Sequence, residues 1–185
     1  MLKRSFDLLV SACLLLILLP VFLLITLAIK VDSRGAVFYV QKRVGQYGRS
    51  FNIYKFRSMV PNADRIGGHS TAQNDARITR MGKFLRKTSL DEIPQLINVL
   101  IGDMSLIGPR PDLPAQEVDY TPEDWQQRCR VKPGITGLAQ ATLRSAATHE
   151  ERTTLDLEYI DRQSFILDMC ILLMTIRQVL GRGGF

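Results

Sequence analysis

The sequence predicts a mostly helical α/β fold with short strands, in which an apolar N-terminal helix packs on one small globular domain. The first observation is an apolar run, Leu8–Ile29, that contains no charged residue. The second is that the rest of the 185 residues has an ordinary soluble composition and fits one compact domain. The third is that short segments rich in aromatic and β-branched residues precede stretches of helical periodicity. We therefore predict a membrane element over residues 1–34 and a globular domain over residues 35–185.

The apolar run reaches the length of about 20 residues that a helix needs to cross a bilayer. Pro20 stands in its middle, where it removes one backbone hydrogen bond and clashes with the preceding turn, so we expect a kink. Basic residues flank the run on both sides: Lys3, Arg4, Lys30 and Arg34. The positive-inside rule then gives no clear orientation. From these features a spanning helix and a re-entrant helix–break–helix, which returns both ends to one side, are equally open.

A second apolar stretch lies near the C-terminus, at Phe165–Ile176. It is interrupted by Asp168, ends at Arg177, and is too short to cross a bilayer. Two interpretations are open: an amphipathic helix at the membrane interface, and a core helix of the globular domain.

The chain is basic, with a formal net charge of +6, which indicates an anionic partner. Two short strands are predicted at Val37–Val40 and Phe51–Phe56. Basic residues recur between positions 42 and 87, both between and after these strands, and one lies within the second strand. Nucleic acid would suit such a run, but no recognised nucleic-acid motif accompanies it. We expect phosphate or anionic lipid headgroups as the partner, and no nucleic acid.

The segment from Ser89 to Asn98 is the most informative stretch of the sequence. Its apolar residues follow the three-and-four spacing of an amphipathic helix, and Ser89 followed by Glu92 resembles a capping box. Asp91 and Glu92 then fall in the first turn, where free N–H groups and the helix dipole keep a carboxylate ionised. Asp91 is expected to share a polar face with Gln95 and Asn98, and an ionised carboxylate so placed could attack phosphorus. Ordinary helix capping is the alternative role for the two acids.

Two glycine- and proline-rich turns follow. In the first, Gly108 and the flanking prolines predict a rigid turn that presents Arg110, whose planar guanidinium suits phosphate oxygens. A surface turn with an arginine exposed by chance is the competing interpretation. The second, Lys132–Leu138, matches no P-loop spacing and is weak by itself.

Taken together these segments resemble the small monotopic phosphoglycosyl transferases, the bacterial sugar transferase family that starts glycoconjugate assembly. The motifs that carry the resemblance run in order along nearly the whole chain: Lys3–Asp7, the apolar segment with Pro20, Gln41–Gly45, Tyr54–Met59, Asp75–Thr79, Ser89–Gln95, Gly102–Pro111, Lys132–Gln140 and Leu155–Ile160. Each motif is modest evidence alone, but nine in register are specific.

The resemblance implies an aspartate–glutamate dyad, carried here by Asp91 and Glu92, and a ping-pong reaction. The aspartate would attack the β-phosphate of a UDP-sugar, release UMP and hold the sugar phosphate covalently until polyprenyl (undecaprenyl) phosphate takes it up. Magnesium is the implied cofactor, with Glu92 and Asp91 as its ligands, since a hard divalent ion needs a carboxylate plus substrate phosphates. Whether Glu92 holds the metal or deprotonates the acceptor is left open. Phosphate contacts are implied for Arg86, Arg110 and Lys55.

The resemblance also implies that the N-terminal helix is re-entrant and bent at Pro20. The active site would then lie on the cytoplasmic face of the bacterial inner membrane, in the domain over residues 35–185 with its C-terminal interfacial helix. Two other functions are weighed against this one: a membrane-anchored basic scaffold, and a membrane phosphohydrolase that uses the same aspartyl intermediate with water as acceptor. The sequence specifies neither the sugar nor an oligomeric state.

Overall fold

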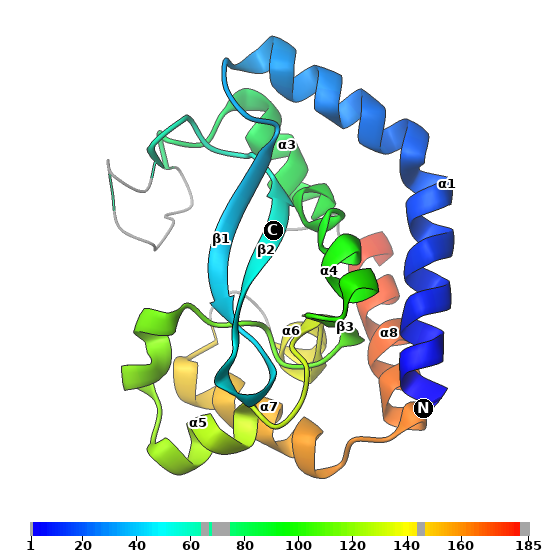
Figure 1. Ribbon diagram of the computed structural model, residues 1–185, viewed down its shortest axis with the longest axis vertical. Coiled ribbons are helices and arrows are strands. Elements are labelled where there is room, and N and C mark those ends of the chain that lie inside the picture. The colour runs from blue at the N-terminus through cyan, green and yellow to red at the C-terminus, as the bar shows by residue number, and fades with distance from the viewer. Residues whose placement is uncertain (1, 64–66, 68–74, 144–146, 182–185) are drawn as a thin grey trace.

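The computed structural model describes residues 2–63, 67, 75–143 and 147–181. The helices are α1 (Leu2–Asp32), α3 (Arg80–Lys87), α4 (Gln95–Ile101), α5 (Pro122–Arg128), α6 (Leu138–Thr142), α7 (His149–Asp161) and α8 (Phe165–Gly181), with the short 3₁₀ helices η1 (Gln46–Gly48), η2 (Leu90–Glu92) and η3 (Pro114–Asp119). The strands are β1 (Phe38–Val44), β2 (Ser50–Phe56), β3 (Ser105–Ile107) and β4 (Gly134–Thr136). The predicted mostly helical α/β fold with short strands is confirmed (Figure 1).

The strands form two separate pairs. β1 and β2 make an antiparallel ribbon in which Phe38 lies opposite Phe56, so both strands expected from the sequence are present, and the first is longer than predicted. β3 and β4 pair in parallel and are only three residues each. A Cβ atom on Gly134 would lie 2.1 Å from the backbone nitrogen of Gly108, so the two chain segments meet backbone to backbone.

Helix α1 runs along one side of the domain and bends part-way along its length (Figure 1). It is long and apolar enough to cross a membrane by length and composition. Pro20 lies inside it, and the helix continues on both sides as one element. The expected kink is therefore present, whereas the break into two helices is not. A proline removes one backbone hydrogen bond and forces a bend, but the strongly helical residues on either side keep the remaining bonds.

One side of α1 packs on the domain from end to end. Its first half contributes Phe6, Val10 and Leu15 to a core cluster centred on buried residues of β2, α4, β3, α7 and α8. Its second half contributes Ile25 and Ile29 to another cluster, with Phe56 of β2 and Leu85 of α3. The other side of α1 exposes large apolar side chains, including Leu16, Ile17, Leu23, Leu24 and Leu27. The exposed apolar side is the surface available to lipid.

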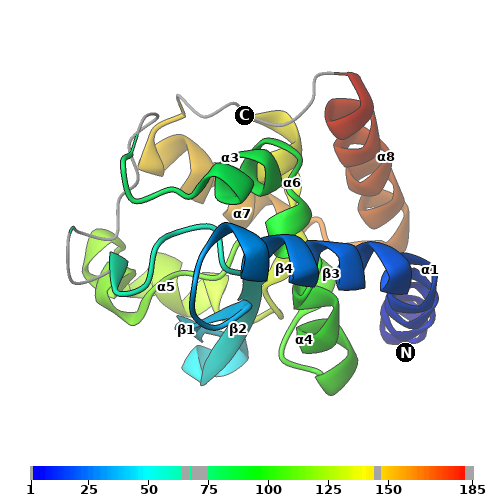
Figure 2. The same ribbon diagram turned by 90° about the horizontal axis from the view of Figure 1, so that it is seen from above.

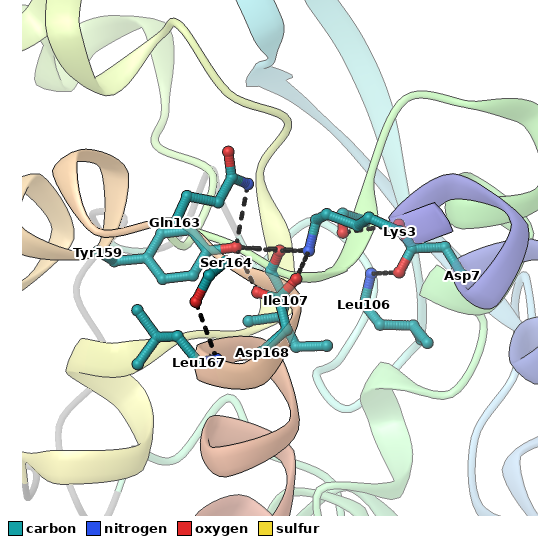
Figure 3. A network of polar contacts seen from close by, with 10 residues as sticks. Lys3, Asp7, Leu106, Ile107, Tyr159, Gln163, Ser164, Leu167 and Asp168 are labelled. Atoms are coloured by element: carbon teal, nitrogen blue, oxygen red, sulfur yellow. Dashed lines mark hydrogen bonds and ion pairs between the residues drawn. The ribbon is translucent and has the colours of Figure 1, made fainter. Parts of the chain in front are cut away.

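Buried polar contacts fasten the N-terminal end of α1 to the domain (Figure 3). Lys3 Nζ lies 2.7 Å from a carboxylate oxygen of Asp168 and 3.0 Å from the Ile107 carbonyl oxygen. The hydroxyl of Tyr159 donates to the other Asp168 oxygen at 2.8 Å. Asp7, itself buried, accepts hydrogen bonds from the Ser105 hydroxyl and the Leu106 amide of β3. The basic residue at position 3 therefore pairs with a buried carboxylate as well as flanking the apolar run.

Arg4 makes a second contact at this end. Its guanidinium donates to the carbonyl oxygens of Val99 and Leu100 at 2.7 and 3.1 Å, which satisfies carbonyls at the C-terminal end of α4.

The C-terminal end of α1 is fastened to the same domain. Arg57, buried directly after β2, donates to the carbonyl oxygens of Ser33 and Arg34 at 2.8 and 3.0 Å. Asp32 accepts a hydrogen bond from the Met81 amide in the first turn of α3 at 3.1 Å. Both ends of α1 are therefore held by polar contacts to one globular domain.

Helix α8 begins close to the N-terminal end of α1 and runs away from it (Figure 2), and the rings of Phe6 and Phe165 meet edge to face at 5.4 Å. Its buried face carries Asp168 and Ile171, while Ile166 and Leu173 are exposed. The expected amphipathic helix is thus present, and Asp168 interrupts the apolar run because it pairs with Lys3. Lipid contact of its exposed face stays a prediction.

Replacing Gly134 by alanine tests the close approach of β4 to Gly108. The new Cβ would overlap the backbone nitrogen and carbonyl oxygen of Gly108, so we expect Gly134→Ala to lower the free energy of unfolding by about 3 kcal/mol. Gly181→Ala is the control, because no atom of the described residues lies within 4 Å of a Cβ at that position. Urea unfolding in detergent, followed by circular dichroism, measures both; equal midpoints would contradict the described packing.

Candidate active site

The two acidic residues lie on a turn of their own, not in the first turn of α4. They belong to η2, and α4 begins at Gln95 after Pro94. Ser89 has φ = 56° in the left-handed region, and its side chain makes no capping bond, so the predicted capping box is wrong. Proline suits a helix start because its missing N–H would be unpaired there, and Pro94 therefore begins a new helix behind the acids.

The segment Leu90–Ile93, here called the dyad turn, packs on an apolar cluster to which α1 contributes. Leu90 and Ile93 pack against the cluster formed by Ile25 and Ile29 of α1 together with Phe56 and Leu85. Two apolar side chains are thus anchored on either side of Asp91 and Glu92. The position of both acids is therefore set by an apolar cluster that α1, β2 and α3 build together.

Glu92 is held by two cations from different elements. Its Oε1 atom lies 2.7 Å from Lys55 Nζ on β2 and 2.7 Å from Arg110 Nη2 on the turn after β3. Burial alone would raise the pKa of Glu92, but the charges of Arg110 and Lys55 outweigh it and hold that pKa far below its usual range. Burial lowers the pKa of Lys55 in spite of the attraction of Glu92. The predicted turn does present Arg110 toward the acidic pair.

Asp91 has the opposite electrostatic environment. Within the described part of the chain its carboxylate forms no hydrogen bond or ion pair. Burial, and next the negative charge of Glu92, raise the pKa of Asp91 to about 6, whereas a helix start was expected to keep it low. Two features explain the difference: Asp91 is not at the start of α4, and the nearby cations contact Glu92 instead. At neutral pH Asp91 is mostly ionised, unpaired and more basic than an ordinary aspartate.

Arg86 lies at the C-terminal end of α3, and its charge acts on Asp91. Its Nε donates to the Ser58 hydroxyl at 2.9 Å, which leaves the two terminal nitrogens without a partner among the described residues. α3 approaches this segment closely, since a Cβ on Gly82 would lie 1.9 Å from the Ser58 carbonyl oxygen. The structure thus groups Asp91, Glu92, Lys55 and Arg110 directly and places Arg86 within their electrostatic reach. Pro20 belongs to α1 and is not part of these ion pairs.

Sequence reasoning missed Ser58 and Arg43. Arg43 donates to the Pro111 carbonyl oxygen at 3.0 Å, and its own pKa responds to the charges of both Arg110 and Glu92. Both residues occur in the sequence motifs, but nothing local separates Arg43 from the other basic residues around it.

The predicted polar face of α4 has a structural role rather than a catalytic one. Asn98 is buried, and its amide donates to the Asn52 carbonyl oxygen at 2.8 Å and accepts from the Tyr54 amide at 3.0 Å. Gln95 is buried as well. Asn98 thus fastens the backbone of β2 immediately before Lys55, and so it helps to position that cation.

The carboxylates fit a magnesium ion that is shared with a substrate. The described residues contain no group of three or more histidine, cysteine, aspartate or glutamate side chains that could hold a metal ion. Magnesium, however, is usually bound by one or two carboxylates together with substrate phosphates. Asp91, which has no protein partner among the described residues, and the second oxygen of Glu92 provide such a pair of donors.

Residues 1–182 match the family model described as bacterial sugar transferase. The chain belongs to this family. A similar protein is the undecaprenyl-phosphate glucose phosphotransferase of Komagataeibacter xylinus, 45% identical over 99% of this chain and 37% of that protein. The uncharacterized sugar transferase EpsL of Bacillus subtilis (strain 168) is 44% identical over 99% of this chain and 89% of its own length.

A third relative, from Escherichia coli (strain K12), is the UDP-glucose:undecaprenyl-phosphate glucose-1-phosphate transferase, 43% identical over 95% of this chain and 39% of that protein. This bacterial sugar transferase therefore spans well under half of two of these relatives and most of the third.

The environment of Asp91 predicts where it titrates. We expect its carboxyl group to have a pKa of about 6, and Arg110→Gln to raise that pKa, because the positive charge of Arg110 lowers it. Carbon-13 NMR of protein labelled in its aspartate carboxyl groups measures the titration, with Asp91→Asn to assign the signal. Arg162→Gln, at an exposed ion pair, should leave it unchanged. An Asp91 pKa near 4 would contradict the described environment.

Proposed function

We propose that the protein transfers a sugar-1-phosphate from a UDP-sugar to polyprenyl phosphate at the membrane surface, releases UMP, and so initiates the assembly of a glycan. The observation that carries the proposal is the contrast between the two acids of the dyad turn. Asp91 has no partner among the described residues and a raised pKa, while the charge of Glu92 is neutralised by Lys55 and Arg110. The acceptor class follows from two relatives that are named as sugar phosphate transferases acting on undecaprenyl phosphate.

In the first step an Asp91 carboxylate oxygen attacks the β-phosphorus of the UDP-sugar. The bond between that phosphorus and the bridging oxygen breaks, and UMP leaves with the bonding electrons. The sugar phosphate is then held on Asp91 as an acyl phosphate. In the second step an oxygen of polyprenyl phosphate attacks the same phosphorus, and the Asp91 carboxylate leaves. A raised pKa makes Asp91 a better nucleophile while it remains mostly ionised at neutral pH.

The basic residues supply the electrostatic part of the reaction. Arg86 has two terminal nitrogens free of protein partners among the described residues, and Arg110 keeps about half of its side chain exposed, so both can bind phosphate oxygens. Lys55 is well buried and, through Glu92, contributes to the positive charge of the site. Fixed cations that face a diphosphate stabilise the charge that develops on the leaving UMP.

Glu92 serves this site as an anchor. A carboxylate whose pKa lies far below the usual range is a poor base, which argues against proton abstraction from the acceptor. Its ion pairs with Lys55 and Arg110 instead hold both cations beside Asp91. Asp91 and Glu92 would together hold magnesium, which when bound neutralises part of the charge of the donor diphosphate.

The contacts of α1 support a re-entrant topology. A conventional crossing would place the two ends of α1 on opposite sides of the membrane, yet Lys3 and Arg57 hold them to one domain, and the helix packs on that domain along its length. We therefore place both ends on the cytoplasmic face of the bacterial inner membrane, with the bend near Pro20 within the bilayer. The dyad turn, which rests on α1, would then lie at the depth of the lipid phosphate.

The covalent step can be tested without the lipid acceptor. Incubation with magnesium and a panel of UDP-sugars should release UMP in a burst of about one equivalent with a competent donor, because the intermediate cannot discharge. Intact-protein mass spectrometry should show one added sugar phosphate. Asp91→Asn should abolish both signals, whereas Asp119→Asn, at an exposed acid, should leave both unchanged.

Three outcomes would contradict this proposal. Normal turnover with polyprenyl phosphate, but neither burst nor adduct at early times, would indicate direct transfer in a ternary complex. Continuous UMP release without lipid, with the sugar phosphate passed to water, would indicate a phosphohydrolase. A protein that binds lipid vesicles and turns over none of the donors would be a scaffold.

A further inference from the structure

A buried ion network stands behind the turn that carries Arg110. Arg128, at the end of α5, uses all three of its guanidinium nitrogens: Nε and Nη2 donate to Asp156 of α7 at 3.1 and 2.8 Å, and Nη1 pairs with Asp112. The Tyr120 ring lies 5.3 Å from the Arg128 guanidinium carbon, and its hydroxyl donates to Asp112 at 2.9 Å. The side chain of Arg128 is 8% exposed, so substrate cannot reach it.

One further bond of this network reaches the site. Arg128 Nη2 donates to the backbone carbonyl oxygen of Arg110 at 2.7 Å. The side chain of that same residue holds Glu92 at 2.7 Å. A single residue thus connects the buried network to the dyad turn.

The whole turn from Pro109 to Asp112 is held in this manner. Its four successive carbonyl oxygens accept, in order, from the Gly134 amide at 2.9 Å, Arg128 Nη2 at 2.7 Å, Arg43 Nη1 at 3.0 Å and the Val44 amide at 2.9 Å. Two of its residues are prolines, which fix their own φ and have no N–H to donate. The turn is therefore fixed by donors from outside itself, and at Arg110 that donor is a charged side chain in a buried network.

We propose that Arg128 is a positioning residue for the transfer reaction: it holds the backbone of Arg110 so that the Arg110 side chain stays on Glu92 and faces the donor phosphates. This inference rests on the proposed function, because it assigns a role within that reaction. Lysine cannot replace Arg128, since one ammonium group cannot serve two carboxylates and a carbonyl in this fork geometry. A charge-assisted bond to a buried carbonyl is the kind of contact that keeps a catalytic group in place.

A double-mutant cycle tests the coupling between the two arginines. The rate of UMP release is compared for the wild type, Arg110→Gln, Arg128→Lys and the double variant, with the donor that the wild type uses. We expect Arg128→Lys to lower kcat by about tenfold or more when Arg110 is present. In the Arg110→Gln background the same change should lower kcat by less than about twofold. The same fold loss in both backgrounds would overturn the inference, because Arg128 would then act independently of Arg110. Arg162→Lys, directly after α7, is the control and should change neither rate.

A second measurement does not depend on turnover. Phenylglyoxal modifies accessible arginines, and peptide mass spectrometry reports the rate at Arg110. Arg128→Lys should speed modification of Arg110. A second variant, Asp156→Asn, keeps Arg128 but removes the charge of its partner, and it should have the same effect. The control Arg162→Lys should leave the rate unchanged. An unchanged rate in folded Arg128→Lys and Asp156→Asn would overturn the inference. Absence of UMP release by the wild type with every donor would instead count against the proposed function, and the modification rates would still decide the role of Arg128.

Discussion

The anchoring of both ends of α1 to one domain is the constraint on which the rest of the structure depends. At the N-terminal end the carboxylate of Asp168, 2% exposed, is held by Lys3 and Tyr159, so its burial is compensated. Removing Lys3 would leave a buried charge with only the Tyr159 hydroxyl, which is far more costly than loss of a surface ion pair. At the other end Arg57 holds two successive carbonyl oxygens beyond the helix. The apolar helix is therefore an integral part of the domain.

Strand β2 connects this anchor to the catalytic pair. Side chains alternate along a strand, so the adjacent residues Lys55 and Phe56 of β2 point to opposite faces, and Arg57 follows the strand directly. Lys55 holds Glu92, Arg57 holds the end of α1, and Phe56 enters the core cluster that supports the dyad turn. The apolar helix α1 and the acidic pair are thus positioned by three consecutive residues. In the proposed reaction this connection places a water-soluble donor and a lipid acceptor at the same turn.

Sequence patterns predicted what local chemistry determines. The apolar run and the strands β1 and β2 depend on neighbours in the chain, and all are present. The glycine and prolines around Arg110 predicted its turn, but the donors that fix this turn come from residues distant in sequence. The capping box failed because Pro94 begins a new helix, and the polar face of α4 failed because Asn98 binds β2. The partners of Lys3 and the raised pKa of Asp91 depend on residues distant in sequence or on burial, which no local pattern reports. The three-residue strands β3 and β4 are too short to show a period.

Labelling of both ends of α1 from one side of the membrane tests the central claim most directly. Single cysteines replace Leu2 and Arg34, both exposed, in a background from which Cys13, Cys129 and Cys170 have been removed. An impermeant maleimide is then applied to inside-out and right-side-out vesicles. The anchoring described here predicts that both positions are labelled in inside-out vesicles and that neither is labelled in right-side-out vesicles. Labelling of one position in each orientation would mean that α1 crosses the membrane, and would contradict the account.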